Sequence, residues 1–156
     1  MQELHGDKKH YKNQLLNWWE VDEFLGCVSI NLTFKMWTNG RSLDDISASQ
    51  NYRHFLNLLS AKCYGSAFKR YGRRIQQINV IEKKNGRWHT HGIMKVPSYL
   101  SKVQFEQHII SSWKKTDWGN KQYVCDWHIN EGWISYMTKF KNNEDHVDFL
   151  NYTWNC

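Results

Sequence analysis

The chain has 156 residues, a formal net charge of +6 and four scattered cysteines without a CxxC pair. This length suits a single domain over residues 1–156, with a core at about 27–141 that follows an N-terminal extension over 1–26. The cysteine spacing argues against a zinc ribbon and against a disulfide scaffold. The sequence shows no signal peptide and no apolar stretch of membrane length, so a reducing cytosolic setting without membrane partners is expected.

The composition is both basic and aromatic. The sequence pI is about 9.1, and 15% of the residues are Phe, Trp or Tyr. Cations follow phosphates and rings stack on bases, so this combination favours a single-stranded nucleic acid as partner. Most of the rings are nevertheless expected in the core.

The first predicted elements are a helix and a strand. A short helix is expected within residues 1–25. Residues 28–34 alternate apolar and polar side chains at period two, which predicts a half-buried strand. Its apolar face carries Val28, Ile30, Leu32 and Phe34, and its other face carries Ser29, Asn31 and Thr33.

A turn and a second helix follow. Residues 38–40 (Thr-Asn-Gly) predict a turn. Residues 50–62 predict a helix that ends near Gly65. Its apolar stripe consists of Tyr52, Phe55, Leu56 and Leu59.

A β-hairpin is predicted over residues 77–94. The Asn-Gly pair at 85–86 is a strong hairpin signal, because both residues tolerate the positive φ of a type I′ turn. A two-residue loop there places Glu82 directly opposite His89, and His91 then points to the same face. A slip of one residue would turn Glu82 to the other face, so this prediction depends on the register.

Two histidines and one carboxylate on one face form a candidate site for a divalent cation. The simpler alternative is a polar sheet face with two solvated histidines. The cross-strand glutamate favours the metal site, because it completes a 2-His-1-carboxylate set with open coordination positions. Non-haem iron oxygenases use the same ligands, but the sequence shows no sign of a site for their co-substrate.

The remaining elements complete an α+β pattern. Ser101 and Gln104 form a capping-box pattern at the start of a helix that carries Phe105, Ile109, Ile110 and Trp113. Residues 123–129 predict a strand and 131–141 a helix, and no clear element follows. Strands interleaved with helices, with antiparallel pairing in the middle, predict a central antiparallel β-sheet flanked by helices on one or both faces.

A tyrosine and a lysine stand together in the last predicted helix. Tyr136 and Lys139 are neighbours on a helix surface, where the ammonium can favour the phenolate or neutralise a phosphate. The alternative is a packing role, because an apolar stripe of core spacing runs through the same segment. That stripe consists of Trp133, Tyr136, Met137 and Phe140.

Together these motifs resemble the HUH endonuclease superfamily, and most closely the nuclease domains of single-tyrosine rolling-circle replication initiators. Residues 89–91 (His-Thr-His) stand in the position of the His-hydrophobe-His motif, with threonine where a larger apolar residue is usual. Glu82 matches an upstream acidic ligand, and residues 136–139 (Tyr-Met-Thr-Lys) match the YxxK motif. Residues 29–34 are similar to the first-strand motif. The resemblance covers about residues 27–141.

The resemblance implies an enzyme that nicks and rejoins single-stranded DNA at an origin or element end. It implies Mn²⁺ or Mg²⁺ on Glu82, His89 and His91, and a 5′-phosphotyrosine intermediate on Tyr136 with Lys139 as charge partner. No Walker A sequence is present, so a separate helicase is expected. The expected location is a bacterial or archaeal cytoplasm, or the host nucleus for an element from a eukaryotic virus.

Five cations are candidate contacts to DNA phosphates. Residues 69–74 interleave charge with an aromatic ring shortly before the hairpin, although a charge run is more often a solvated face. The candidates are Arg41, Lys69, Arg70, Arg73 and Arg74. Two other functions stay open: a single-tyrosine transposase with the same catalytic parts, and a single-strand binding module without catalysis.

Overall fold

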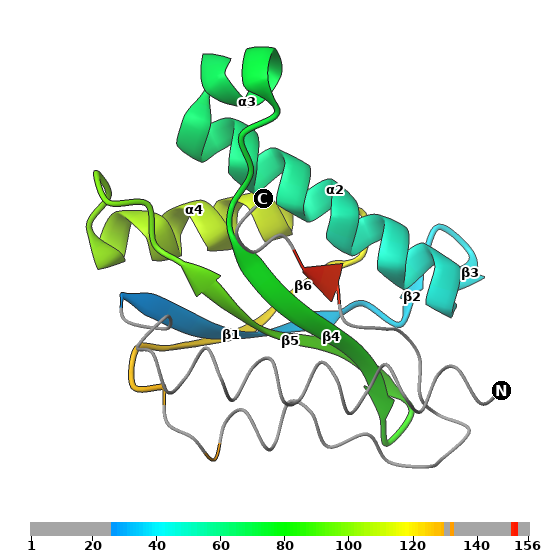
Figure 1. Ribbon diagram of the computed structural model, residues 1–156. Coiled ribbons are helices and arrows are strands. Elements are labelled where there is room, and N and C mark those ends of the chain that lie inside the picture. The colour runs from blue at the N-terminus through cyan, green and yellow to red at the C-terminus, as the bar shows by residue number, and fades with distance from the viewer. Residues whose placement is uncertain (1–25, 130–131, 133–150, 153–156) are drawn as a thin grey trace, which may run out of the picture.

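A computed structural model describes residues 26–129, 132 and 151–152. Its centre is an antiparallel sheet in the strand order β6-β1-β5-β4-β7 (Figure 1). The α+β class predicted from the sequence is therefore confirmed. The sheet consists of β1 (Cys27–Phe34), β4 (Gln77–Lys84), β5 (Arg87–Lys95), β6 (Gly119–Asp126) and β7 (Asn151–Tyr152). Strands β2 (Trp37–Thr38) and β3 (Arg41–Ser42) form a separate small hairpin.

Helices α2 (Asp45–Tyr64) and α4 (Lys102–Lys114) lie on the same face of the sheet (Figure 1). The ring of Trp113 on α4 meets two phenylalanines edge-on, with centroids 4.9 Å from Phe34 of β1 and 5.4 Å from Phe55 of α2. Edge-to-face packing of this kind suits aromatic quadrupoles. The predicted apolar face of the first strand is confirmed, because Val28, Ile30, Leu32 and Phe34 are all buried in this core.

Helix α2 begins at Asp45, five residues before the predicted start at 50. The side chain of Asp44 accepts a hydrogen bond of 2.7 Å from the Ser47 backbone N–H, which caps the helix. Gly65 ends it at φ 52°, as the sequence predicted. A short helix that was not predicted, α3 (Ser66–Tyr71), follows directly.

The predicted capping box of α4 is confirmed. Ser101 Oγ accepts from the Gln104 N–H at 3.1 Å, and Gln104 Oε1 accepts from the Ser101 N–H at 2.9 Å. Strand β6 is shifted towards the N-terminus from the predicted 123–129. It ends at Asp126 because the Asp126 carboxylate accepts from the His128 N–H at 2.9 Å and turns the chain.

Two predicted helices, at 1–25 and 131–141, lie outside the described residues, apart from Gly132, which is helical. Strand β7 pairs with the outer edge of β4 and was not expected, because a two-residue strand has no periodicity to detect. No helix in the described part of the chain is long and apolar enough to cross a membrane.

Candidate metal site on the β4–β5 hairpin

The turn between β4 and β5 sets the register of the site. Asn85 and Gly86 have φ values of 52° and 73°, as a type I′ turn requires. Glu82 therefore pairs directly with His89, as the sequence predicted. His91 pairs with Val80 on one side and with Asn31 of β1 on the other, so this histidine lies in the middle of the sheet.

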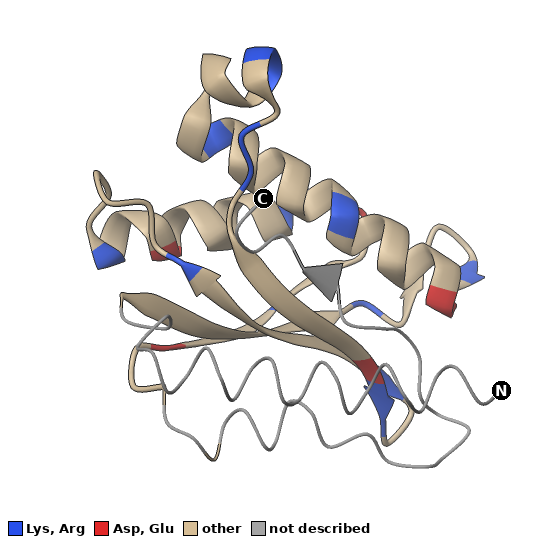
Figure 2. Cartoon of the chain, viewed as in Figure 1, with Lys and Arg blue, Asp and Glu red and all other residues tan. Residues whose placement is uncertain are grey.

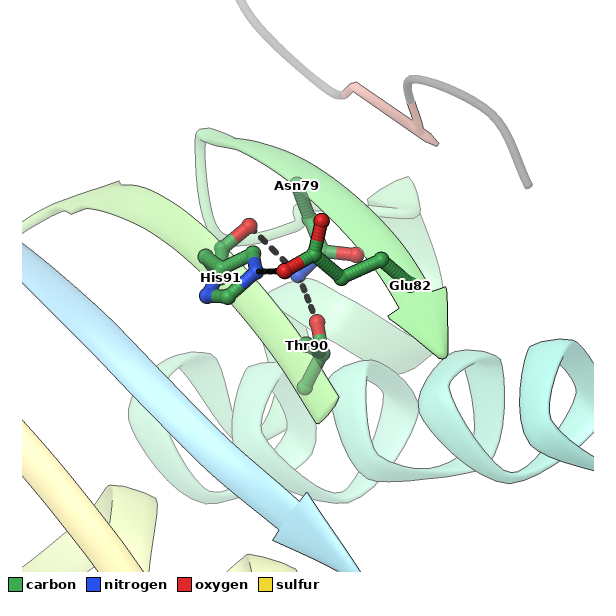
Figure 3. A network of polar contacts seen from close by, with 4 residues as sticks. All are labelled: Asn79, Glu82, Thr90 and His91. Carbon is green, nitrogen blue, oxygen red and sulfur yellow. Dashed lines mark hydrogen bonds and ion pairs between the residues drawn. The ribbon is translucent and has the colours of Figure 1, made fainter. Parts of the chain in front are cut away.

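The closest contact in the cluster runs diagonally across the hairpin. His91 Nε2 lies 2.8 Å from Glu82 Oε1 (Figure 3). Diagonal neighbours are about 7–8 Å apart at the backbone, a span that long side chains can bridge. The two imidazole rings are stacked at an interplanar angle of 27°, with centroids 6.1 Å apart. Glu82 thus meets His91 rather than the histidine directly opposite.

Burial and neighbouring charges set the protonation of this cluster. The hydrogen bond from His91 lowers the pKa of Glu82 below its usual 4.5. Burial lowers the pKa of His89 below 6.5, and the charges of His91, Lys84 and Arg87 act in the same direction. At neutral pH, Glu82 is therefore an anion and His89 is neutral, the forms that bind a cation.

The donor types fit a divalent cation, because two imidazoles and one carboxylate share one face of the hairpin. The 2.8 Å between Glu82 Oε1 and His91 Nε2 is a direct contact between the two groups, so both would have to turn to bind a shared ion. His89 would have to turn towards them. As they stand, no three His, Cys, Asp or Glu side chains converge on one point among residues 26–129, 132 and 151–152.

A buried amide supports His91 from the opposite face of the sheet. Asn79 Nδ2 donates to Thr90 Oγ1 and, at 3.1 Å, to the backbone oxygen of His91 (Figure 3). Asn79 and Thr90 are both fully buried. This network gives a physical reason for threonine in the middle slot of the His-x-His motif, because its hydroxyl accepts a bond that an apolar residue cannot.

Gly92 makes room for this amide. A Cβ at Gly92 would lie 2.6 Å from the backbone oxygen of Ile78 and 3.3 Å from the Asn79 side chain. Since Gly92 pairs with Asn79 across the hairpin, the glycine leaves space for the amide to lie over β5.

The predicted DNA-contacting cations lie on other elements than the cluster. Arg41 is on β3, and Lys69 and Arg70 are on α3. Arg73 and Arg74 precede the start of β4, whereas Glu82 is near its other end, about 17 Å further along the strand. Figure 2 shows basic residues on α3 and on the segment that leads into β4.

Arg73 and Arg74 also have contacts within the fold. The guanidinium of Arg73 lies 4.6 Å from the centroid of the Tyr64 ring, and that of Arg74 lies 5.3 Å from the Phe68 ring. Arg74 also donates to Asn57 Oδ1. These contacts hold the segment against α2 and α3, so a packing role accompanies any role in binding.

Tyr136 and Lys139 lie outside the described residues. In the chain they fall between β6 and β7, which occupy opposite edges of the sheet. Their relation to the histidine cluster therefore stays a prediction.

The turn register also predicts a pair of cations near the cluster, although the sequence did not single them out as functional. Lys84 pairs directly with Arg87, and both are exposed. The register that places Glu82 opposite His89 also places these two cations on the same face. Their position beside the cluster therefore follows from the Asn85-Gly86 turn.

Comparison of the chain with protein-family models, with curated proteins and with solved structures gives no match.

Proposed function

We propose that this protein is a metal-dependent enzyme of the HUH type that nicks and rejoins single-stranded DNA. One observation carries the proposal: two histidines and a glutamate share one face of a central hairpin, and the glutamate contacts one of the two imidazoles. The antiparallel sheet with helices on one face and the His-x-His strand in its middle agrees with the fold that the resemblance implies.

The cation is proposed to be held by Glu82, His89 and His91. Two imidazoles suit Mn²⁺ better than Mg²⁺. When bound, the cation supplies charge stabilisation for the non-bridging oxygens of the scissile phosphate. Asn79 supports the position of His91 from the opposite face of the sheet, through the His91 backbone oxygen.

Tyr136 is the proposed nucleophile. Its phenolic oxygen forms a bond to phosphorus, the bond from phosphorus to the 3′-oxygen breaks, and the 5′-phosphate stays on the tyrosine. The phenolic proton is lost and the leaving 3′-oxygen gains one, so the step is balanced. Lys139, three residues further along the chain, would favour the phenolate by its charge. The reverse step reseals the strand.

The proposal also includes contacts to the DNA backbone and a protein partner. Arg41, Lys69, Arg70, Arg73 and Arg74 are proposed contacts to the DNA backbone. A separate helicase would supply the single strand. The proposed setting is an origin of replication in a bacterial or archaeal cytoplasm or in a host nucleus.

The covalent step can be tested by trapping. The protein is incubated with a random library of single-stranded DNA and Mn²⁺, and the adducts are resolved on denaturing gels. Tyr136→Phe should form no adduct, whereas Tyr123→Phe, at an exposed residue of β6, should form as much as the wild type. Mass spectrometry should place the nucleotide on the peptide with Tyr136. A full yield of adduct from Tyr136→Phe would refute the assignment.

The metal requirement needs its own experiment. EDTA should abolish adduct formation, and so should His89→Ala or His91→Ala in a protein that remains folded. Glu82→Ala should weaken Mn²⁺ binding about 10–100-fold if the carboxylate mainly supports His91. Undiminished adduct from His91→Ala in chelator would exclude this metal site.

A binding module without catalysis is the second candidate. The contact between Glu82 and His91 favours it, because the two groups form an ion pair with each other without a cation. Such a module would bind single strands but form no adduct with any DNA. A single-tyrosine transposase would form the same adduct, and the trapped sequences would then be element ends rather than a replication origin.

A further inference from the structure

The tip of the β4–β5 hairpin carries two cations beside the histidine cluster. Along β4, Lys84 is two residues beyond Glu82, and along β5, Arg87 is two residues before His89. Side chains two residues apart point to the same face, so all four lie on one face of the hairpin. Figure 2 shows the basic residues gathered at the hairpin tip, next to an acidic segment of β4.

Lys83 occupies the other face. It pairs with Trp88, and its ammonium lies 5.8 Å from the centroid of that ring. Trp88 is buried in the core beneath α2 and α4. The two adjacent lysines therefore have the same charge but point to opposite faces of the hairpin.

The charge of Lys84 and Arg87 is not neutralised within the described part of the chain. The ion pair found among those residues joins His91 to Glu82, and neither cation has a carboxylate within 4.0 Å. Both side chains are exposed. An anion at the tip would therefore face two cations beside a candidate metal site.

We propose that Lys84 and Arg87 form a phosphate clamp that holds the backbone of single-stranded DNA next to the histidine cluster. This inference rests on the proposed function for the identity of the ligand. Two residues along a strand span about 7 Å, so a phosphate held at the tip lies about that far from the Glu82–His89 pair. Arg87 supplies a planar fork for two phosphate oxygens, and Lys84 supplies a point charge. The clamp thus fixes which phosphate lies over the ligands.

The test measures binding of labelled oligo(dT) by the full chain in EDTA over a series of salt concentrations. Metal-dependent cleavage is absent under these conditions, so binding is read alone. Lys84→Gln and Arg87→Gln should each reduce the slope of log K against log salt by about 0.7, and the double variant by about 1.4. Lys83→Gln is the matched control, with the same charge change on the opposite face, and should leave the slope unchanged.

The outcomes separate the clamp from the enzyme. The clamp would be overturned if the salt slope of Lys84→Gln were the same as that of the wild type. It would also be overturned if Lys83→Gln reduced the slope as much as Lys84→Gln does, or if the wild type did not bind oligo(dT). A wild type that binds with the expected slopes but forms no adduct would keep the clamp and refute the enzyme. Adduct formation together with an unchanged slope in the double variant would keep the enzyme and refute the clamp. Thermal unfolding of each variant shows that it is folded.

Discussion

The buried network behind His91 makes a quantitative prediction. Asn79→Leu keeps the size of the side chain but removes the donor to Thr90 Oγ1 and to the His91 backbone oxygen. Thr90 is fully buried, and a buried polar group left unsatisfied costs about 1–3 kcal/mol, whereas the His91 oxygen keeps its place in the sheet between β1 and β4. We expect a loss of about 1–3 kcal/mol in the free energy of unfolding. For a domain of this size, that corresponds to a decrease in Tm of about 2–12 °C.

Thr90→Val should cost less, about 1 kcal/mol, because Asn79 still donates to the His91 oxygen. The double variant should lose about 1 kcal/mol less than the sum of the two single losses. The reason is that apolar groups then replace both members of the hydrogen bond between Asn79 and Thr90, so neither is left unsatisfied. Urea unfolding followed by tryptophan fluorescence measures all four stabilities.

The control pairs Thr90→Val with Thr116→Val. Thr116 contacts Asn51 and the Trp113 backbone oxygen, so the two threonines share no hydrogen-bond partner, and their effects should add within about 0.5 kcal/mol. Additive losses for Asn79→Leu and Thr90→Val, or a loss below about 0.5 kcal/mol for Asn79→Leu, would refute this description of the network.

Two further predictions concern the helix cap and the basic segment. The hydrogen bond from the Ser47 N–H lowers the pKa of Asp44 below 3.8, so its stabilising effect is complete above that pH and is lost as the pH falls through the lowered value. Urea unfolding should therefore show a smaller stability difference between the wild type and Asp44→Ala at pH 2.5 than at pH 6, and an equal difference would contradict the cap. Replacing Arg73 and Arg74 together by Ala should make the salt dependence of oligo(dT) binding shallower by about 1.4. An unchanged slope with a lower Tm would limit both arginines to their contacts with Tyr64 and Phe68.

The sequence predicted the hairpin well because its turn is specified locally. Asn85-Gly86 determines the register of every pair between β4 and β5, and with it the common face of Glu82 and His89. Side-chain rotamers are not specified in this way. The diagonal contact of Glu82 with His91 and the separation of the two imidazole rings therefore could not be predicted.

The missed elements lack the patterns on which sequence prediction depends. The first turn of α2 presents an exposed Ile46 rather than an apolar stripe, so its start is marked by the Asp44 cap alone. Helix α3 has one turn and a half and buries no residue fully. The polar network was missed because Asn79 sits in a run of apolar residues, where its partners follow only from the cross-strand pairing.

The hairpin also has a consequence for the order of folding. Glu82 and His89 are close in the chain, whereas pairing His91 with Asn31 of β1 closes a loop many times longer. The entropic cost of closing the shorter loop is lower by roughly 2 kcal/mol. β-Hairpins form within about 1–10 μs, much faster than sheets built from distant strands. The three candidate ligands and the two tip cations all lie on this one local element, so they are brought together before β1 and β6 join the sheet.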